Sequence, residues 1–119
     1  MIIHQGDIYW VQVNELDLET HIAHPHVVLQ PTVLNQSRIA TLVVCALTTN
    51  VRRAHLPGNV LLEVGEANLP RQSIVEVSKV SAVAKAELGE YIGTLSAERL
   101  AQIFAGMAFV QETFIRQDM

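Results

Sequence analysis

The spacing of apolar residues changes near residue 96, and this change limits the folds that the chain can adopt. Before that point, apolar residues form short runs rich in β-branched side chains and separated by turn residues, which is typical of strands. Beyond it they return every three or four positions, as they do along one face of a helix. The residues of this helical stripe are Leu100, Ile103, Phe104, Met107, Val110 and Phe114. Several strands followed by one helix predict a small α+β domain, mainly β, with a curled sheet.

Six segments are predicted to form the strands. The first, IYWVQV (8–13), follows the turn residues Gly6 and Asp7. The second, HVVLQP (26–31), ends at a proline, which cannot donate to a strand ladder. The others are IATLVVCALTT (39–49), NVLLEV (59–64), SIVEVSKVSAV (73–83) and YIG (91–93). We expect the segment 39–49 to be buried on both faces along much of its length, and the chain to turn at 35–37.

Polar segments between the strands predict two loops, NELDLETHIAH (14–24) and NVRRAHLPGN (50–59). Long loops on small domains often carry function. Near the end of the chain, Ser96 is a suitable helix N-cap, and Leu95 with Leu100 would form a hydrophobic staple. These signals predict a helix running to about residue 115. Its apolar stripe is expected to pack on the sheet, with surplus apolar surface for a homodimer.

Composition and charge narrow the function classes. The chain has 119 residues, half of them apolar, which suits one domain with one compact core. Its net charge of −4 disfavours nonspecific DNA binding, so a nucleic-acid role needs a local basic patch, and a cationic partner is the alternative. No apolar run reaches the roughly 18 residues of a membrane span. The lone Cys45 fits a reducing cytoplasm, and its apolar surroundings favour packing over a nucleophilic role.

Three histidines gather around the start of the second predicted strand: His21, His24 and His26. The last two are separated by one residue, so they point to the same face if both lie in the strand. The pattern H-x-x-H-x-H has enough nitrogen for a metal, but no second cluster has a suitable ligand spacing, so we predict neither a metal nor a cofactor. A single imidazole acting as acid or base is the better prediction, because histidine exchanges protons near neutral pH. His26, inside the strand, could instead be packed and hydrogen-bonded.

A second polar cluster, ALTTNVRRAH (46–55), follows the long buried strand. Thr48 and Thr49 end the strand, and two arginines and a histidine follow in the loop. Hydroxyl and guanidinium groups together suit a phosphate, and the alternative is a solvated loop. A third candidate is Glu19 in the first loop, which could equally be a solubilising charge.

Several segments are most informative when taken in order. They are GDIYWVQV (6–13), HPHVVLQ (24–30), TLVVCALTT (41–49), NVLLEV (59–64) and SIVEVSKVSAVAKAELGEYIGTLS (73–96), followed by the terminal helix. Together they resemble the MazF/PemK toxin family of bacterial toxin–antitoxin systems, over nearly the whole chain. The resemblance implies one toxin domain over residues 1–119. Its fold would be the small SH3-like barrel of PemK/CcdB-type plasmid toxins with a C-terminal α-helix.

The same resemblance implies an activity and partners. Members are metal-independent, sequence-specific endoribonucleases that cut single-stranded RNA, often mRNA. In their reaction the 2′-hydroxyl attacks the adjacent phosphorus and leaves a 2′,3′-cyclic phosphate and a 5′-hydroxyl. The resemblance further implies a cytoplasmic homodimer and a cognate antitoxin whose disordered acidic segment blocks the RNA groove.

The family's site residues carry over unevenly. The family threonine at the phosphate falls on Thr48, and the acidic residue of the first loop falls on Glu19. The arginine that normally precedes the family proline is replaced by His24, and the glycine-rich approach to it has become DLETHIA (17–23). Ser81 and Ala84 stand where some members carry arginine and aspartate. The remaining candidates for contact with RNA or phosphate are Thr49, Arg52, Arg53, His55 and Lys79.

The histidine at this position allows opposite interpretations. Arginine is a strong phosphate clamp but a poor proton donor and acceptor, whereas histidine has the reverse properties. In the first interpretation, His24 performs acid–base catalysis and Arg52 or Arg53 supplies the lost positive charge. In the second, the site is weakened, and the protein is a binding module that holds an antitoxin peptide and takes part in operon regulation. A gyrase poison with the same barrel is a third and weaker alternative, because the terminal helix has few aromatic residues to present.

Overall fold

The computed structural model of the chain describes residues 2–13 and 22–117. The strands in these ranges are β1 (Asp7–Val13), β2 (Ile22–Val28), β3 (Thr41–Thr48), β4 (Val60–Leu62), β5 (Ser73–Ala84) and β6 (Leu88–Thr94). The helices are α1 (Thr32–Asn35) and α2 (Ala97–Gln117), with short 3-10 turns η1 (Val51–His55), η2 (Glu66–Asn68) and η3 (Lys85–Glu87). No helix within the described ranges is both long and apolar enough to cross a membrane.

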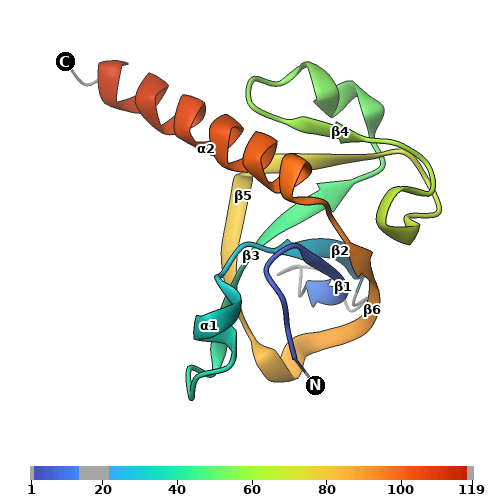
Figure 1. The fold of residues 1–119 in the computed structure, drawn as a ribbon. Coiled ribbons are helices and arrows are strands. Elements are labelled where there is room, and N and C mark those ends of the chain that lie inside the picture. Colours follow the sequence, from blue (N-terminus) through green and yellow to red (C-terminus); the bar gives the residue numbers. More distant parts are fainter. Residues whose placement is uncertain (1, 14–21, 118–119) are drawn as a thin grey trace.

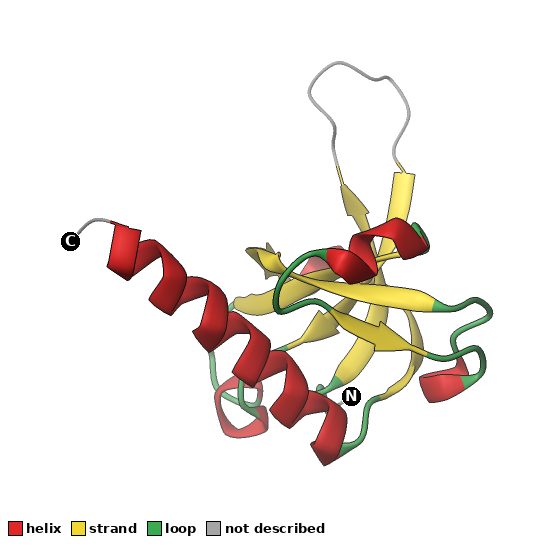
Figure 2. Cartoon of the chain, turned by 90° about the horizontal axis from the view of Figure 1, so that it is seen from above, coloured by secondary structure: helices red, strands yellow, loops and turns green. Residues whose placement is uncertain are grey.

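The strands form one antiparallel sheet in the order β4-β5-β3-β2-β1-β6. The sheet curls into a half-barrel, and α2 crosses it on the side of β5 and β4 (Figure 1). Seen from above, α2 runs along one side of the strands (Figure 2). The predicted fold, mainly β with one C-terminal helix, is confirmed.

Successive residues of the central strands enter two different hydrophobic clusters, because side chains alternate across a sheet. In β1, Ile8 joins the cluster beneath α2, and Tyr9 joins the cluster inside the curl. In β2, Val27 and Val28 divide in the same way. A slip of one residue would exchange the two sets, so the register of these strands is strongly fixed. The larger cluster contains Ile8, Val27, Leu29, Cys45, Leu47, Val60, Leu62, Leu69, Val75, Val77, Leu95 and Ile103, and the smaller one Ile3, Tyr9, Val28, Leu42 and Val44.

The second strand begins earlier than expected. We predicted a loop up to residue 24, but β2 starts at Ile22, so His24 and Pro25 lie inside the strand. Pro25 is opposite Trp10 of β1, whereas the pairing of β2 with β3 begins only at His26. The missing N–H of Pro25 therefore falls where β2 has no partner on its other side, which is where a strand tolerates proline.

The expected burial of the long strand is wrong for its first half. Leu42 and Val44 are fully buried inside the curl, but Val43 between them is 38% exposed. Only one face of the sheet is covered there, so β3 is buried on both faces only at its middle, where Val44 and the next residue, Cys45, are both fully buried. The segment before β3 also differs, because a short helix at 32–35 precedes the expected turn.

The helix start agrees with the sequence signal. The backbone N–H of Arg99 donates to Ser96 Oγ at 3.2 Å, so Ser96 caps α2 as predicted. Arg99 also donates from Nε to Glu66 Oε2 at 2.7 Å and from its terminal nitrogen to Glu66 Oε1 at 3.0 Å. Partial burial alone would raise the pKa of Glu66, but these hydrogen bonds and one from the Glu63 backbone lower it overall. The first turn of α2 is thereby tied to η2.

Two glycines allow α2 to approach the loop before β4 at backbone distance. A Cβ added to Gly106 of α2 would overlap the carbonyl oxygen of Gly58. A Cβ on Gly58 would lie 2.6 Å from the carbonyl oxygen of Gly106. The position of α2 on the sheet therefore depends on the absence of side chains at both residues.

Candidate active site

His24 and Thr48 lie on the neighbouring strands β2 and β3. The antiparallel pairing of these strands ends at His26 and Ala46. His24 and Thr48 each lie two residues beyond that last pair. Both residues are partly exposed, and both line the same two adjoining pockets. The structure thus brings together the two side chains on which the catalytic prediction mainly rests.

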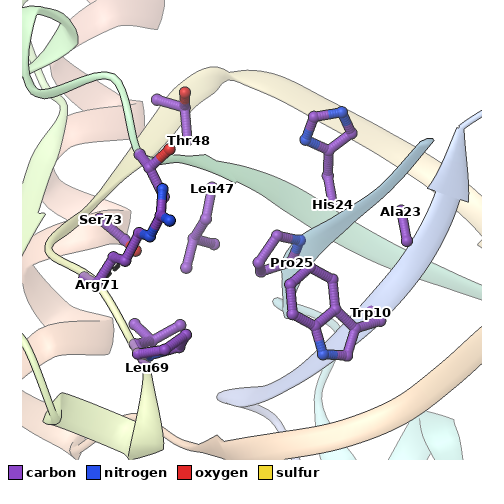
Figure 3. Close-up of a pocket in the computed structure, with 11 residues that line it drawn as sticks. Trp10, Ala23, His24, Pro25, Leu47, Thr48, Leu69, Arg71 and Ser73 are labelled. Carbon is purple, nitrogen blue, oxygen red and sulfur yellow. Dashed lines mark hydrogen bonds between the residues drawn. The ribbon is translucent and has the colours of Figure 1, made fainter.

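The first of these pockets, the tryptophan pocket, has a volume of about 290 Å³. Trp10 and Pro25 lie on one side, Leu69 and Arg71 on the other, with Leu47 between them (Figure 3). Its lining residues are Trp10, Ala23, His24, Pro25, Leu47, Thr48, Thr49, Leu69, Pro70, Arg71 and Ser73. The pocket is therefore mainly apolar, with the polar groups of His24, Thr48 and Arg71 at its edge.

Two further hollows continue from the tryptophan pocket. The lysine pocket, about 360 Å³, shares His24, Leu47 and Thr48 with it. The outer hollow, about 600 Å³, shares Trp10 and Ala23. The lysine pocket is lined by His24, His26, Ala46, Leu47, Thr48, Glu76, Lys79, Val80 and Ser81, and the outer hollow by Trp10, Gln12, Ala23, Ala86, Glu87, Leu88 and Gly89. The three hollows are thus neighbours through shared residues, and His24 and Thr48 belong to two of them.

The basic residues predicted from the sequence differ in how their charges are placed. Glu76 is buried, with a side chain only 6% exposed, and it faces Lys79 Nζ at 3.4 Å and Arg53 Nε at 3.9 Å. The charges of Lys79 and Arg53 are thus partly balanced at the lysine pocket. Arg52 and His55 are exposed residues of η1 and line none of these three hollows. Neither is brought to the His24–Thr48 pair.

Arg71 is a basic residue at the tryptophan pocket that the sequence interpretation did not select. It lies just before β5, and its guanidinium makes no hydrogen bond or ion pair within the described part of the chain, although it lines the tryptophan pocket with His24 and Thr48. The sequence signal was weak: an isolated Pro-Arg-Gln between two strands. Ser73 and Trp10 were also missed, because both lie within strands that were assigned to packing.

The catalytic and binding roles of the other candidate residues remain predictions. Thr49 lines the tryptophan pocket, and Thr48 Oγ1 accepts a hydrogen bond from the Asn50 backbone at 3.2 Å. Glu19 and His21 lie outside the described residues. Within the described ranges, no three His, Cys, Asp or Glu side chains are arranged to hold a metal ion.

Cys45 is packed, as predicted. It is fully buried, and its thiol donates to the backbone carbonyl of Glu76, with Sγ and O 3.0 Å apart. Burial, with the nearby Glu76 charge, raises the pKa of this thiol to about 12. A thiol that stays protonated at neutral pH is a poor nucleophile.

His26 is packed and hydrogen-bonded, one of the alternatives drawn from the sequence. It is 5% exposed, and its Nδ1 lies 2.9 Å from the carbonyl oxygen of His24, so Nδ1 carries the proton that is donated. Burial lowers its pKa, although the hydrogen bond to His24 opposes this effect. The folded protein therefore favours the neutral form of His26.

The burial of His26 predicts that the folded protein loses stability as the pH falls. The unfolded chain binds a proton on His26 near pH 6.5, whereas the folded chain binds it only at lower pH. The stability contributed by the neutral form is present above that pH and is lost as the pH falls below it. We expect the free energy of unfolding, measured by urea titration, to decrease less between about pH 7.5 and pH 5 in His26→Gln than in the wild type. Equal decreases in the two proteins would contradict this account.

Comparisons with known proteins agree with this architecture. The family model described as PemK-like, MazF-like toxin of type II toxin–antitoxin system matches residues 4–110. Endoribonuclease MazF2 of Mycobacterium bovis is 30% identical over 108 residues, which cover 90% of this chain and 95% of that protein.

Two solved structures show the same fold. The Mycobacterium tuberculosis toxin MazF-mt6 superposes with a TM-score of 0.74 at 21% identity, covering 89% of this chain and 96% of that one. A MazE–MazF structure (Form-II) from Deinococcus radiodurans superposes with a TM-score of 0.77 at 16% identity, covering 94% and 97%. Taken with the match over residues 4–110, these likenesses show that the chain belongs to the PemK-like, MazF-like toxins of type II toxin–antitoxin systems.

Proposed function

We propose that this protein is an endoribonuclease toxin that cuts single-stranded RNA. The observation that carries the proposal is the meeting of an imidazole and a hydroxyl, His24 and Thr48, at the junction of two open pockets. Family membership and the activity named for the mycobacterial relative support it. The alternative of a weakened binding module is not favoured.

The proposed reaction is an internal phosphoryl transfer. The 2′-oxygen loses its proton and bonds to the adjacent phosphorus, the bond from phosphorus to the 5′-oxygen breaks, and that oxygen takes up a proton. The products are a 2′,3′-cyclic phosphate and a 5′-hydroxyl, and no water is consumed. Such a step needs one proton acceptor, one proton donor and stabilisation of negative charge on the phosphate.

The residues present can be assigned to these tasks. His24 would act as the acid or the base, because an imidazole can do either near neutral pH. Thr48 would hold the phosphate through its hydroxyl, next to His24 across the two strands. Glu19, outside the described residues, is proposed to orient or accept a proton. Lys79 would guide the RNA backbone on the side of the lysine pocket, and Thr49 would add a hydroxyl to the tryptophan pocket.

The proposed partners follow from the family. One neighbour by fold, with a TM-score of 0.69, is a mycobacterial endoribonuclease in complex with its cognate antitoxin. We propose that a cognate antitoxin also binds this chain, which would act as a cytoplasmic homodimer formed from one toxin domain over residues 1–119.

The experiment is an RNA cleavage assay with analysis of the ends. Purified protein is incubated with a long single-stranded RNA in excess EDTA, and the fragments are tested for 2′,3′-cyclic phosphate and 5′-hydroxyl termini. We expect cutting at a short recurrent sequence. The cleavage rate should fall about 10²–10³-fold in Thr48→Ala, because this substitution removes one group that binds the charge developing on the phosphate. Ends of another chemistry, or equal cutting by wild type and variant, would refute the proposal.

A further inference from the structure

The proposed reaction needs a positive charge, which the sequence interpretation assigned to Arg52 or Arg53. Arg52 lines none of the three hollows, and Arg53 faces the buried carboxylate of Glu76 at 3.9 Å. Lys79 faces the same carboxylate at 3.4 Å. A buried anion holding two cations weakens the field that either presents to a second anion. The lysine pocket is therefore poorly suited to stabilise charge on a transferring phosphate by itself.

Arg71 fits that requirement. Its side chain lies on one wall of the tryptophan pocket and extends toward the Thr48 end (Figure 3). Among the described residues, no carboxylate lines this pocket and the guanidinium has no ion-pair partner. A guanidinium that makes no internal contact keeps all its N–H donors available for a phosphate, which it binds through two parallel hydrogen bonds.

The backbone that carries Arg71 is held on both sides. Leu69 is 1% exposed, and the Gly65 N–H donates to its carbonyl oxygen at 2.8 Å. Ser73, two residues after Arg71, is buried, and its hydroxyl donates to the Arg71 carbonyl oxygen at 3.0 Å. The ion pair of Glu66 with Arg99 ties the preceding turn to α2. A fixed backbone lowers the entropy cost of presenting a long side chain to a ligand.

The opposite wall of the pocket suits a flat ring. Trp10 and Pro25 are opposite each other in the β1–β2 pairing and lie together in Figure 3. Unpaired RNA bases stack on aromatic side chains, and the volume of about 290 Å³ is at the small end for ligand pockets, which suits one base rather than several.

We propose that the tryptophan pocket is a nucleotide subsite, in which Arg71 binds the phosphate at the bond that is cut and Trp10 stacks on the adjoining base. This inference rests on the proposed function and adds two residues to it. Arg71 supplies the positive charge that would otherwise accompany an arginine at position 24. Trp10 contributes affinity with little sequence selectivity, because every base has a stacking face.

The binding test uses a fluorescein-labelled DNA oligonucleotide, which lacks the 2′-hydroxyl and cannot be cut by this reaction. Affinity is measured by anisotropy over a series of salt concentrations. One phosphate contact contributes about 0.7 to the slope of log affinity against log salt for a single strand, so Arg71→Ala should lose about that much. Arg71→Lys keeps the charge and should keep the slope. Trp10→Ala should weaken binding roughly 5- to 150-fold and leave the slope unchanged, whereas Trp10→Phe should retain most of the affinity.

The matched control is Arg38→Ala. Arg38 is exposed and precedes the start of β3, at the opposite end of that strand from Thr48. The loss of charge is the same as in Arg71→Ala, but the slope and the affinity should stay at the wild-type values. A change of slope shared by both variants would show that only net charge matters, and it would overturn the proposal.

The cleavage test separates this inference from the proposed function. On RNA, Arg71→Ala should cut about 10²–10³-fold more slowly than the wild type, and Arg71→Lys should be intermediate. If the wild type cuts RNA but Arg71→Ala cuts equally well, the subsite is wrong and the nuclease stands. If the wild type does not cut but the binding changes occur, the nuclease is wrong, and only the binding roles of Arg71 and Trp10 stand. A wild type that binds no oligonucleotide at any salt concentration would assign the pocket to another class of ligand and overturn the inference.

Discussion

His24→Ala is expected to lower the rate of RNA cleavage by about 10²–10⁴-fold, the usual range for removing a general acid or base. The variant should also change the shape of the pH–rate profile. Histidine side chains change charge between about pH 5 and pH 8, so the wild-type rate should bend in that interval. In His24→Ala, the bend should be absent and the residual rate should follow a smooth line. The measurement is the single-turnover rate on one RNA across this pH range.

His4→Ala is the control for this prediction. His4 is an exposed histidine outside the three hollows, so its removal should leave both the rate and the profile unchanged. A His24→Ala enzyme that is slow but retains the wild-type bend would assign the titration to another group. His24 would then be a residue that binds substrate without moving a proton.

The largest effect on stability is expected at the crossing of α2 and the loop before β4. Gly106→Ala places a methyl group where it overlaps the carbonyl oxygen of Gly58, and neither backbone can yield without moving the helix. Overpacking of this kind costs about 1–3 kcal/mol or more, against a gain of about 1 kcal/mol in helix propensity. We expect a net decrease of about 2 kcal/mol in the free energy of unfolding, measured by urea titration.

Ala101→Gly is the corresponding change at an exposed position of the same helix. It should lower the free energy of unfolding by only about 1 kcal/mol, through propensity alone. The two substitutions therefore test packing against propensity in one helix. A Gly106→Ala protein more stable than the wild type would show that α2 does not need its close approach to Gly58.

The fold could be predicted from the sequence because the spacing of apolar residues is unambiguous in the main strands and in the terminal helix. The runs at β1, β3 and β5 are rich in β-branched residues, and the stripe beyond Ser96 has one clear helical period. Boundaries were less accurate. The start of β2 was placed too late because its first residues were assigned to a polar loop, whereas the structure includes them in the strand and places Pro25 where no ladder bond is required.

The candidate site was only partly accessible from the sequence. The resemblance to the family selected His24 and Thr48 together, because each lies in a segment that matches the family pattern, and both line the same two pockets. The basic residues are harder to choose from sequence for a physical reason. Arg52 and Arg53 are adjacent in the chain and attract attention, but whether a charge acts on the site depends on its neighbours in space. Arg53 faces Glu76 and Arg71 lines the tryptophan pocket, and neither position follows from the spacing of these residues in the sequence.

The strand β5 is divided sharply by burial, and this division has a consequence for how such toxins diversify. Residues 73–77 are buried, whereas residues 78–82 are exposed, although they continue the same strand. Substitutions in the first half would disturb folding, so selection would remove them. Substitutions in the second half would leave the fold intact, so selection would act on the contacts that these exposed side chains make. Lys79, Val80 and Ser81 border the lysine pocket in that permissive half. A saturation library of β5 should therefore yield altered target preferences from residues 78–82 alone, and inactive, poorly accumulating proteins from the residues before them.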